Sequence, residues 1–182
     1  MTGADVLSIV GCLTDAGMNI WLDGGWGVDA VVGSETRPHS DLDAVIELEN
    51  ADAVVDLLAP LRFRMSLDDR PTRFVLVDDH GRRIDFHPVV FDENGNGLQI
   101  GAGANGGDAI YPAEGLRGAG SIAGQPVACL TPGLLLKHHT GYQPLEKDAH
   151  NVRLLCEAFG LPIPRSYERW LRPREEAGDR LD

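Results

Sequence analysis

Two neighbouring segments are the most informative part of the sequence: Trp21-Leu22-Asp23-Gly24-Gly25-Trp26-Gly27-Val28-Asp29-Ala30 and Arg37-Pro38-His39-Ser40-Asp41-Leu42-Asp43. The diglycine Gly24-Gly25 lies between a short apolar run and the mainly apolar residues 28–32. This order predicts a strand, a tight turn and a helix. Backbone amides at such a turn face phosphate oxygens well, and glycine lets the backbone approach them closely.

An acid pair follows the diglycine. Residues 41–48 predict a strand, whose period of two places Asp41 and Asp43 on one face, about 6–7 Å apart along the chain. A third acid, Asp85, lies between Ile84 and Phe86 in a second predicted strand. Two divalent ions about 3.5–4 Å apart stabilise the transition state of nucleotidyl transfer. Mg²⁺ prefers oxygen ligands. We expect Asp41 and Asp43 to bridge two Mg²⁺ ions, and Asp85 to complete one site and accept the substrate proton.

Each of these elements has an ordinary alternative explanation. An Asp-x-Asp pattern is common on solvated strand faces, a Gly-Gly pair is usually only a turn, and a lone acid is often exposed on an edge strand. The order in which they occur supports a nucleotide site. Arg37 and His39 stand just before the acid pair, where they are expected to meet anionic oxygens.

The same stretch closely resembles lincosamide nucleotidyltransferases and, less closely, the aminoglycoside nucleotidyltransferases. Later blocks extend the resemblance over about residues 4–164: Asp85-Phe86-His87, Ala109-Ile110-Tyr111-Pro112, Gly124-Gln125-Pro126-Val127, Lys137-His138-His139-Thr140-Gly141-Tyr142 and Leu155-Cys156-Glu157-Ala158-Phe159-Gly160. The resemblance implies an α+β nucleotidyltransferase (polymerase-beta-like) fold, Mg²⁺ dependence, ATP or another NTP as co-substrate, and Asp41, Asp43 and Asp85 as the carboxylate triad. It also places Lys137 near the triphosphate.

One departure concerns the phosphate turn. The wider superfamily has Gly-Ser at this position, whereas this chain has Gly25 where the serine would stand. The families that it resembles share the Gly-Gly form. Acceptor pockets diverge faster than phosphate turns, so the resemblance says more about the donor than about the acceptor.

Length and composition predict one enzyme domain. With 182 residues and 43% apolar content the chain can bury a sizeable core. We expect a nucleotidyltransferase core over residues 1–130 with a small mixed sheet flanked by helices, a C-terminal helical part of the same domain over 131–164, and a charged tail over 165–182, either a surface helix or partly disordered.

The net charge of −12 argues against a nucleic-acid partner, because phosphate binding needs an electropositive surface. It favours a cationic acceptor, with an acidic surface expected near Asp29, Glu35, Asp85 and residues 92–108, although solubility alone explains the charge equally well. The three cysteines show no metal-ligand spacing, and no segment approaches the ~20 apolar residues of a membrane span. A cytoplasmic enzyme is expected.

Several elements are predicted from periodicity and turn residues. These are helices over residues 5–16, 54–58, 131–139 and 148–159, strands over 20–22, 41–48, 73–77 and 83–90, a turn at 79–81, and a loop from 94 to 107. Thr131 is expected to cap the helix over residues 131–139. Trp21, Trp26 and Tyr142 either line the pocket or belong to the core.

The sequence therefore predicts a Mg²⁺-dependent enzyme of antibiotic resistance that transfers AMP from ATP to a hydroxyl of a small-molecule antibiotic, a lincosamide first. The alternatives are an aminoglycoside or another hydroxylated small molecule as acceptor, a metal-dependent phosphohydrolase that uses the same carboxylates on water, and a noncatalytic nucleotide-binding module. The expected nucleotide-binding residues are Gly24, Gly25, Arg37, His39 and Lys137. Formation of a homodimer is left open.

Overall fold

A mixed β-sheet organises the chain, in which the computed structural model describes residues 1–140 and 142–171. The strands are β1 (Ile20–Asp23), β2 (Asp41–Glu47), β3 (Arg64–Asp69), β4 (Arg73–Val77), β5 (Arg83–Phe91), β6 (Gly97–Gln99), β7 (Ala109–Tyr111), β8 (Gly118–Ile122) and β9 (Gln125–Cys129). The α-helices are α1 (Gly3–Asp15), α2 (Gly24–Val32), α3 (Ala51–Leu58), α4 (Pro132–His138), α5 (Glu146–Phe159) and α6 (Glu168–Leu171).

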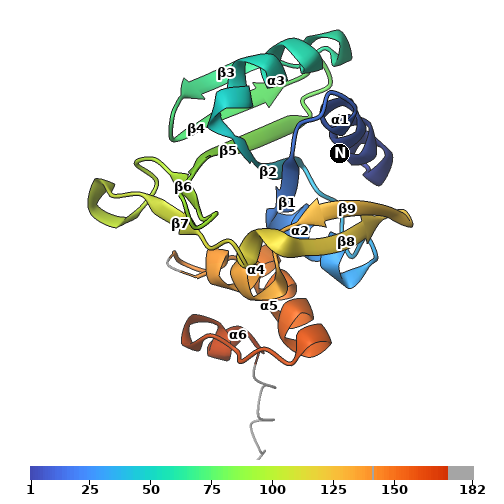
Figure 1. Cartoon of the computed structure of the whole chain (residues 1–182). Helices are drawn as coiled ribbons and strands as arrows, with labels where there is room; N and C mark the ends of the chain where they lie inside the picture. Colours follow the sequence, from blue (N-terminus) through green and yellow to red (C-terminus); the bar gives the residue numbers. More distant parts are fainter. Residues whose placement is uncertain (141, 172–182) are drawn as a thin grey trace, which may run out of the picture.

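The strand order is β3-β4-β5-β2-β1-β9-β8, and β6 and β7 continue from β5 as a separate extension (Figure 1). The pairs β2–β5 and β1–β9 are parallel, whereas the other neighbours are antiparallel. The expected small mixed sheet flanked by helices is therefore confirmed.

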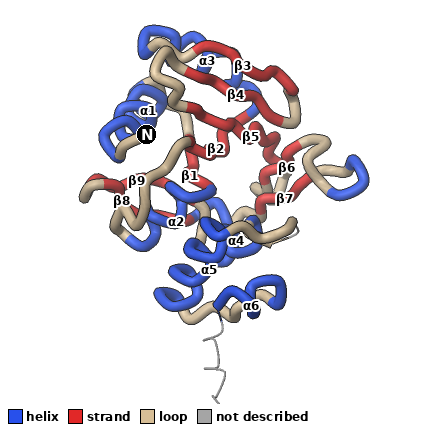
Figure 2. Tube along the Cα trace, turned by 180° about the vertical axis from the view of Figure 1, so that it is seen from behind, coloured by secondary structure: helices blue, strands red, loops and turns tan. Residues whose placement is uncertain are grey.

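Alternation along β2 divides the molecule into two packing regions. Leu42, Ala44 and Ile46 point into a buried apolar cluster that α1 and α3 close from their side of the sheet. Val45, on the opposite face of β2, joins a second cluster formed largely by α2, α4 and α5. Figure 2 shows α4, α5 and α6 grouped at the end of the molecule away from α3. Since side chains alternate, Asp41 and Asp43 point away from α1 and α3.

Local signals account for most helix ends. Thr2 and Asp5 form a capping box at the start of α1, and Gly17, with φ of 79°, follows its end. Gly160 ends α5 in the left-handed conformation. Thr131 holds the N-cap position of α4 as expected, but its side chain makes no capping hydrogen bond.

Two expectations about loops and ends need correction. The segment expected to be a loop from 94 to 107 contains β6, which pairs with both β5 and β7. The expected tail begins with an ordered part, since Tyr167 is fully buried and its hydroxyl donates to the His139 carbonyl at 2.5 Å. The remainder of that tail, residues 172–182, lies outside the described residues. No helix of the described ranges is long and apolar enough to span a membrane.

Candidate active site

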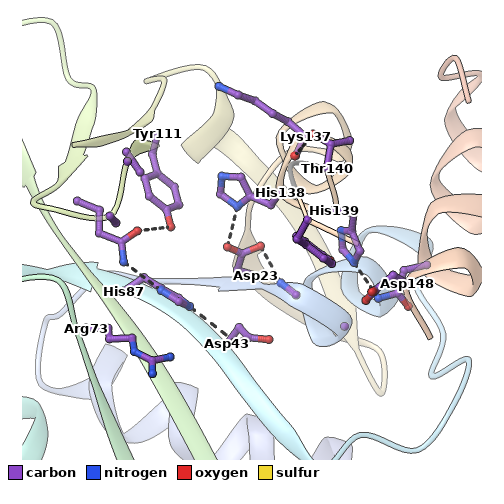
Figure 3. A pocket seen from close by; sticks show the side chains of 18 of the residues that line it. Asp23, Asp43, Arg73, His87, Tyr111, Lys137, His138, His139, Thr140 and Asp148 are labelled. Carbon is purple, nitrogen blue, oxygen red and sulfur yellow. Dashed lines mark hydrogen bonds and ion pairs between the residues drawn. The ribbon is translucent and has the colours of Figure 1, made fainter. Parts of the chain in front are cut away.

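A cavity of about 1100 Å³ lies between the sheet and helices α4 and α5 (Figure 3). Its lining includes most of the residues singled out from the sequence, namely Gly24, Gly25, Arg37, Asp41, Asp43 and Lys137. The extension β6–β7 closes the other side with Gln99, Ile110 and Tyr111. A cavity of this size can hold a nucleotide together with part of a small acceptor.

The acids form a row because of strand register. Asp43 on β2 is directly opposite Asp23 on β1 and Asp85 on β5. Directly opposed residues point to the same face, so these carboxylates lie side by side across three strands. Asp41 adds a fourth acid on that face, two residues along β2. The fold thus concentrates negative charge beside the diglycine turn.

Asp85 is part of this row but does not line the cavity. Its Oδ2 lies 3.2 Å from Arg73 and 3.5 Å from Arg83, while its Oδ1 is buried without a hydrogen-bond partner. The expected triad therefore comes together in register, but the carboxylate of its third member faces two arginines.

His39 is also absent from the cavity lining. Its side chain is buried, with Nε2 2.6 Å from Asp29 Oδ2, and its ring packs on Trp26 with 4.6 Å between centroids. Asp29 is fully buried and also accepts hydrogen bonds from the amide and hydroxyl of Thr36. The expectation for Asp29 is thereby corrected: it contributes no acidic surface, because a buried carboxylate must find partners inside the protein. His39 lies outside the cavity lining, and its expected contact with anionic oxygens stays a prediction.

The position of His39 explains the diglycine. A Cβ on residue 25 would lie 2.5 Å from His39 Nδ1 and 2.7 Å from an Arg37 nitrogen. The ring of His39 cannot retreat, because Asp29 and Trp26 hold it. The space that a serine side chain would need is therefore filled, and this is why the Gly-Ser turn of the wider superfamily does not fit here.

Asp23 caps α2 and holds a histidine. Its Oδ1 accepts from the Gly24 amide at 2.7 Å, and its Oδ2 lies 2.9 Å from His138 Nδ1. Burial of Asp23 opposes its ionisation, but the hydrogen bond from His138 and its charge outweigh this, so the pKa of Asp23 is lowered. The Gly24 amide is therefore occupied, and Gly25 is the glycine of the turn whose amide Asp23 does not bind.

A second chain of hydrogen bonds reaches Asp43 from β6 and β7 (Figure 3). The Tyr111 hydroxyl donates to Gln99 Oε1 at 3.0 Å, and Gln99 Nε2 lies 3.1 Å from His87 Nδ1. Gln99 Nε2 also donates to the Thr72 carbonyl, which fixes its amide and makes His87 Nδ1 an acceptor. His87 Nε2 then carries the hydrogen and faces Asp43 Oδ1 at 3.8 Å.

Charge and burial act on both ends of this chain. Burial opposes protonation of His87, but Asp43, Asp23 and Asp85 outweigh it, so the pKa of His87 is raised. Burial and the charges of Asp23 and Asp43 raise the pKa of Tyr111, which keeps its hydroxyl protonated as a donor.

The donor set suits a divalent metal ion. Asp41 and Asp43 bring carboxylate oxygens to the cavity, and the buried Asp85 Oδ1 lacks a partner. Oxygen ligands of this kind fit Mg²⁺. Within residues 1–140 and 142–171, however, no three His, Cys, Asp or Glu side chains stand close enough together to form a metal cluster. Asp85 contacts Arg73 and Arg83 through its Oδ2.

Several site residues were not predicted from the sequence. Asp23 had a signal, since an aspartate directly before a helix is a frequent N-cap. His138 and His139 were not predicted as site residues, and the structure gives them separate hydrogen-bond partners, Asp23 and the Leu135 carbonyl. No local sequence pattern indicates Gln99 or Asn151 as site residues, because only the tertiary structure brings these amide side chains to the cavity. Trp26 is core, whereas Tyr142 lines the cavity.

Comparison with known proteins gives consistent results. The sequence model of the aminoglycoside-2''-adenylyltransferase family matches residues 5–155. The lincosamide resistance protein of Staphylococcus haemolyticus is 26% identical over 135 residues, which is 74% of this chain and 82% of that protein. The crystal structure of the lincosamide antibiotic adenylyltransferase LnuA with lincomycin bound has a TM-score of 0.75 at 23% identity, covering 85% of this chain and 96% of LnuA.

A further solved structure, ANT(2")-Ia in complex with adenylyl-2"-tobramycin, has a TM-score of 0.66 at 20% identity and covers 86% of this chain and 88% of that one. The two structural likenesses identify the fold as that of the nucleotidyltransferases.

Proposed function

The chain belongs to the aminoglycoside-2''-adenylyltransferase family, and from this premise we propose that it transfers AMP from ATP to a hydroxyl of a lincosamide antibiotic. The observation that carries the proposal is the single cavity that joins the Gly24-Gly25 turn, Asp41, Asp43 and Lys137. The lincosamide resistance protein and LnuA make this class the first candidate acceptor. The site of action we propose is the cytoplasm, where ATP is available.

ATP binding involves Gly25, Arg37 and Lys137. The Gly25 backbone at the start of α2 meets phosphate oxygens, helped by the partial positive charge of the helix end. Arg37 and Lys137 line the same cavity and offset the triphosphate charge. The helical part over 131–164, with α4 and α5, thus completes the site that the 1–130 core begins, and we propose that both belong to one domain.

Asp41 and Asp43 would hold Mg²⁺ against the triphosphate, with Asp85 completing the ligand set. Two such ions, when bound, stabilise the negative charge that develops on the phosphate oxygens. Asp85 is also the proposed proton acceptor for the attacking hydroxyl, through the Oδ1 that has no partner. For this role its carboxylate must turn from Arg73 and Arg83 toward Asp43, its neighbour in register.

The acceptor side of the cavity favours a molecule with little positive charge. Asp148 is buried there and accepts from the Leu145 amide at 2.9 Å, which leaves Asp108 as the remaining acid of the lining away from the catalytic row. Asp108 in turn accepts from the Gly101 amide, and Lys147 adds a cation. An aminoglycoside carries several ammonium groups and would find few carboxylates here, so it is the second candidate.

Mass spectrometry tests the proposal. The enzyme is incubated with each NTP and Mg²⁺, and with lincosamides, aminoglycosides or simple sugars. We expect one AMP unit to be added to the lincosamide, with ATP as donor. Release of AMP without any acceptor would instead favour the phosphohydrolase alternative, and modification of aminoglycosides alone would make those the substrate class.

A further inference from the structure

A line of buried polar contacts runs from α4 to the phosphate turn. His139 Nδ1 lies 2.8 Å from the Leu135 carbonyl, which can only accept, so Nδ1 carries a hydrogen. The other ring nitrogen, Nε2, then accepts from Asn151 Nδ2 at 3.0 Å. The Asn151 amide is thereby oriented with its Oδ1 toward Arg37 Nε, at 3.4 Å. Each contact fixes the polarity of the next one.

Burial makes this line rigid. Asn151 is 2% exposed and His139 is 5% exposed, so neither side chain can exchange its partner for bulk water at low cost. His139 lies beside Asp148 at the α5 end of the cavity (Figure 3). Asn151 is the member that reaches across to a residue 114 positions earlier in the chain.

Arg37 is held at two of its nitrogens. Asn151 binds Nε, and Nη1 donates to the Pro38 carbonyl at 3.1 Å. Nη2 remains, and it points at the turn, where it would lie 2.7 Å from a Cβ on Gly25. The guanidinium is therefore presented to the cavity in one orientation beside the diglycine.

We propose that Asn151 is a positioning residue for the nucleotide, acting through Arg37. A guanidinium that is already oriented loses less conformational freedom when it binds a phosphate. Without Asn151, Arg37 keeps only its contact with the Pro38 carbonyl, and the ligand must supply the rest of the ordering, which corresponds to an ATP affinity about 2- to 10-fold lower. The identity of the nucleotide rests on the function proposed above, whereas the coupling of Asn151 to Arg37 does not.

A double-mutant cycle on the full chain provides the test. ATP with Mg²⁺ and no acceptor is titrated by calorimetry into the wild type, Asn151→Ala, Arg37→Ala and the double variant. We expect Asn151→Ala to weaken ATP binding about 2- to 10-fold in the wild type, and by less than about 1.5-fold when Arg37 is already alanine. In steady-state assays the KM for ATP should rise while kcat changes little.

Cys156→Ala is the matched control on the same helix. Cys156 is buried on α5, and its sulfur contacts the Pro162 carbonyl rather than any member of the line of contacts. This variant should lower the melting temperature and leave ATP affinity unchanged. If Asn151→Ala does not melt cooperatively, Asn151→Ser retains a polar group in the buried position, is too short to hold both partners, and is judged by the same cycle.

Equal factors for Asn151→Ala in both backgrounds, or no change in ATP affinity at all, would overturn the positioning role. An equal loss of affinity in Cys156→Ala would do the same, since it would show a general effect of α5 stability. A cycle that holds in an enzyme that modifies no acceptor would leave the positioning role standing and remove the proposed function. If the enzyme modifies an acceptor but Asn151→Ala weakens ATP binding by the same factor with and without Arg37, the proposed function stands and the positioning role is removed.

Discussion

Replacement of Gly24 by alanine tests how closely the Gly24-Gly25 turn is packed against Asp43. Gly24 has φ of 55°, and a Cβ there would lie 2.9 Å from Asp43 Cγ and closer still to its Oδ2. The substitution therefore adds backbone strain and also pushes directly on Asp43. Gly33, at the other end of α2, is the matched control, since it has φ of 81° but meets only Ser121 Oγ, at 3.8 Å.

The two variants separate strain from steric displacement. Gly33→Ala should cost about 1–2 kcal/mol for the left-handed conformation alone. Gly24→Ala adds roughly 1–3 kcal/mol for the overpacked contact. For a domain of this size each kcal/mol lowers the melting temperature by about 2–4 °C. Displacement of Asp43 by about 1 Å should also reduce turnover on the order of 100-fold.

The assay combines thermal melting with acceptor-dependent pyrophosphate release. Gly33→Ala should melt a few degrees lower and keep its activity, whereas Gly24→Ala should lose most activity even where it is fully folded. If Gly24→Ala retained turnover within about threefold of Gly33→Ala, a Cβ on residue 24 would not displace Asp43 enough to affect turnover, contrary to the prediction.

The remaining predictions concern single carboxylates and one arginine. Asp43→Asn should leave the fold intact and reduce turnover below about a tenth of the wild-type value, because it removes a charge proposed to hold metal against phosphate; higher activity measured on folded protein would contradict the proposed metal role. Asp85→Asn should reduce turnover far more than ATP affinity, and equal losses in the two measurements would argue against a proton acceptor. Arg82→Gln should reduce the unfolding free energy by about 1–3 kcal/mol at neutral pH. Arg82 contacts both Asp5 and Asp78. The pKa of Asp5 is lowered by the Thr2 amide and Arg82, and that of Asp78 is lowered by Arg82 and nearby amides in spite of burial. The difference in urea denaturation should therefore be full above about pH 4 and shrink as pH falls through the lowered folded pKa values; a difference that is constant down to pH 2 would exclude the ion pairs as its source.

The central strands were predictable because their local pattern agrees with their place in the sheet. The alternation of 41–48 and the apolar run of 83–90 gave β2 and β5 almost to the residue. The strands β8 and β9 were not predicted, because two glycines, two alanines and a proline in Gly118–Ile122 and Gln125–Cys129 carry little strand preference of their own. Their pairing with each other, and of β9 with β1, is decided by tertiary contacts.

The candidate site was predictable in residue type more than in orientation. Asp41 and Asp43 were found because their spacing alone places them on one face of a strand. The orientation of Asp85 depends on Arg73 and Arg83, and that of His39 on the buried Asp29. The pairs with Arg73 and Asp29 join different secondary-structure elements, and nothing in the local pattern of β5 indicates which partner Asp85 takes.

Following the α-phosphate of ATP tests nucleotidyl transfer to a lincosamide directly. ATP labelled at that phosphate is incubated with the enzyme, Mg²⁺ and a lincosamide, and the products are separated. We expect the label to appear on the lincosamide, in proportion to the pyrophosphate released, and Asp43→Asn to abolish both. Label recovered as free AMP at the same rate with and without the lincosamide would contradict nucleotidyl transfer to the antibiotic.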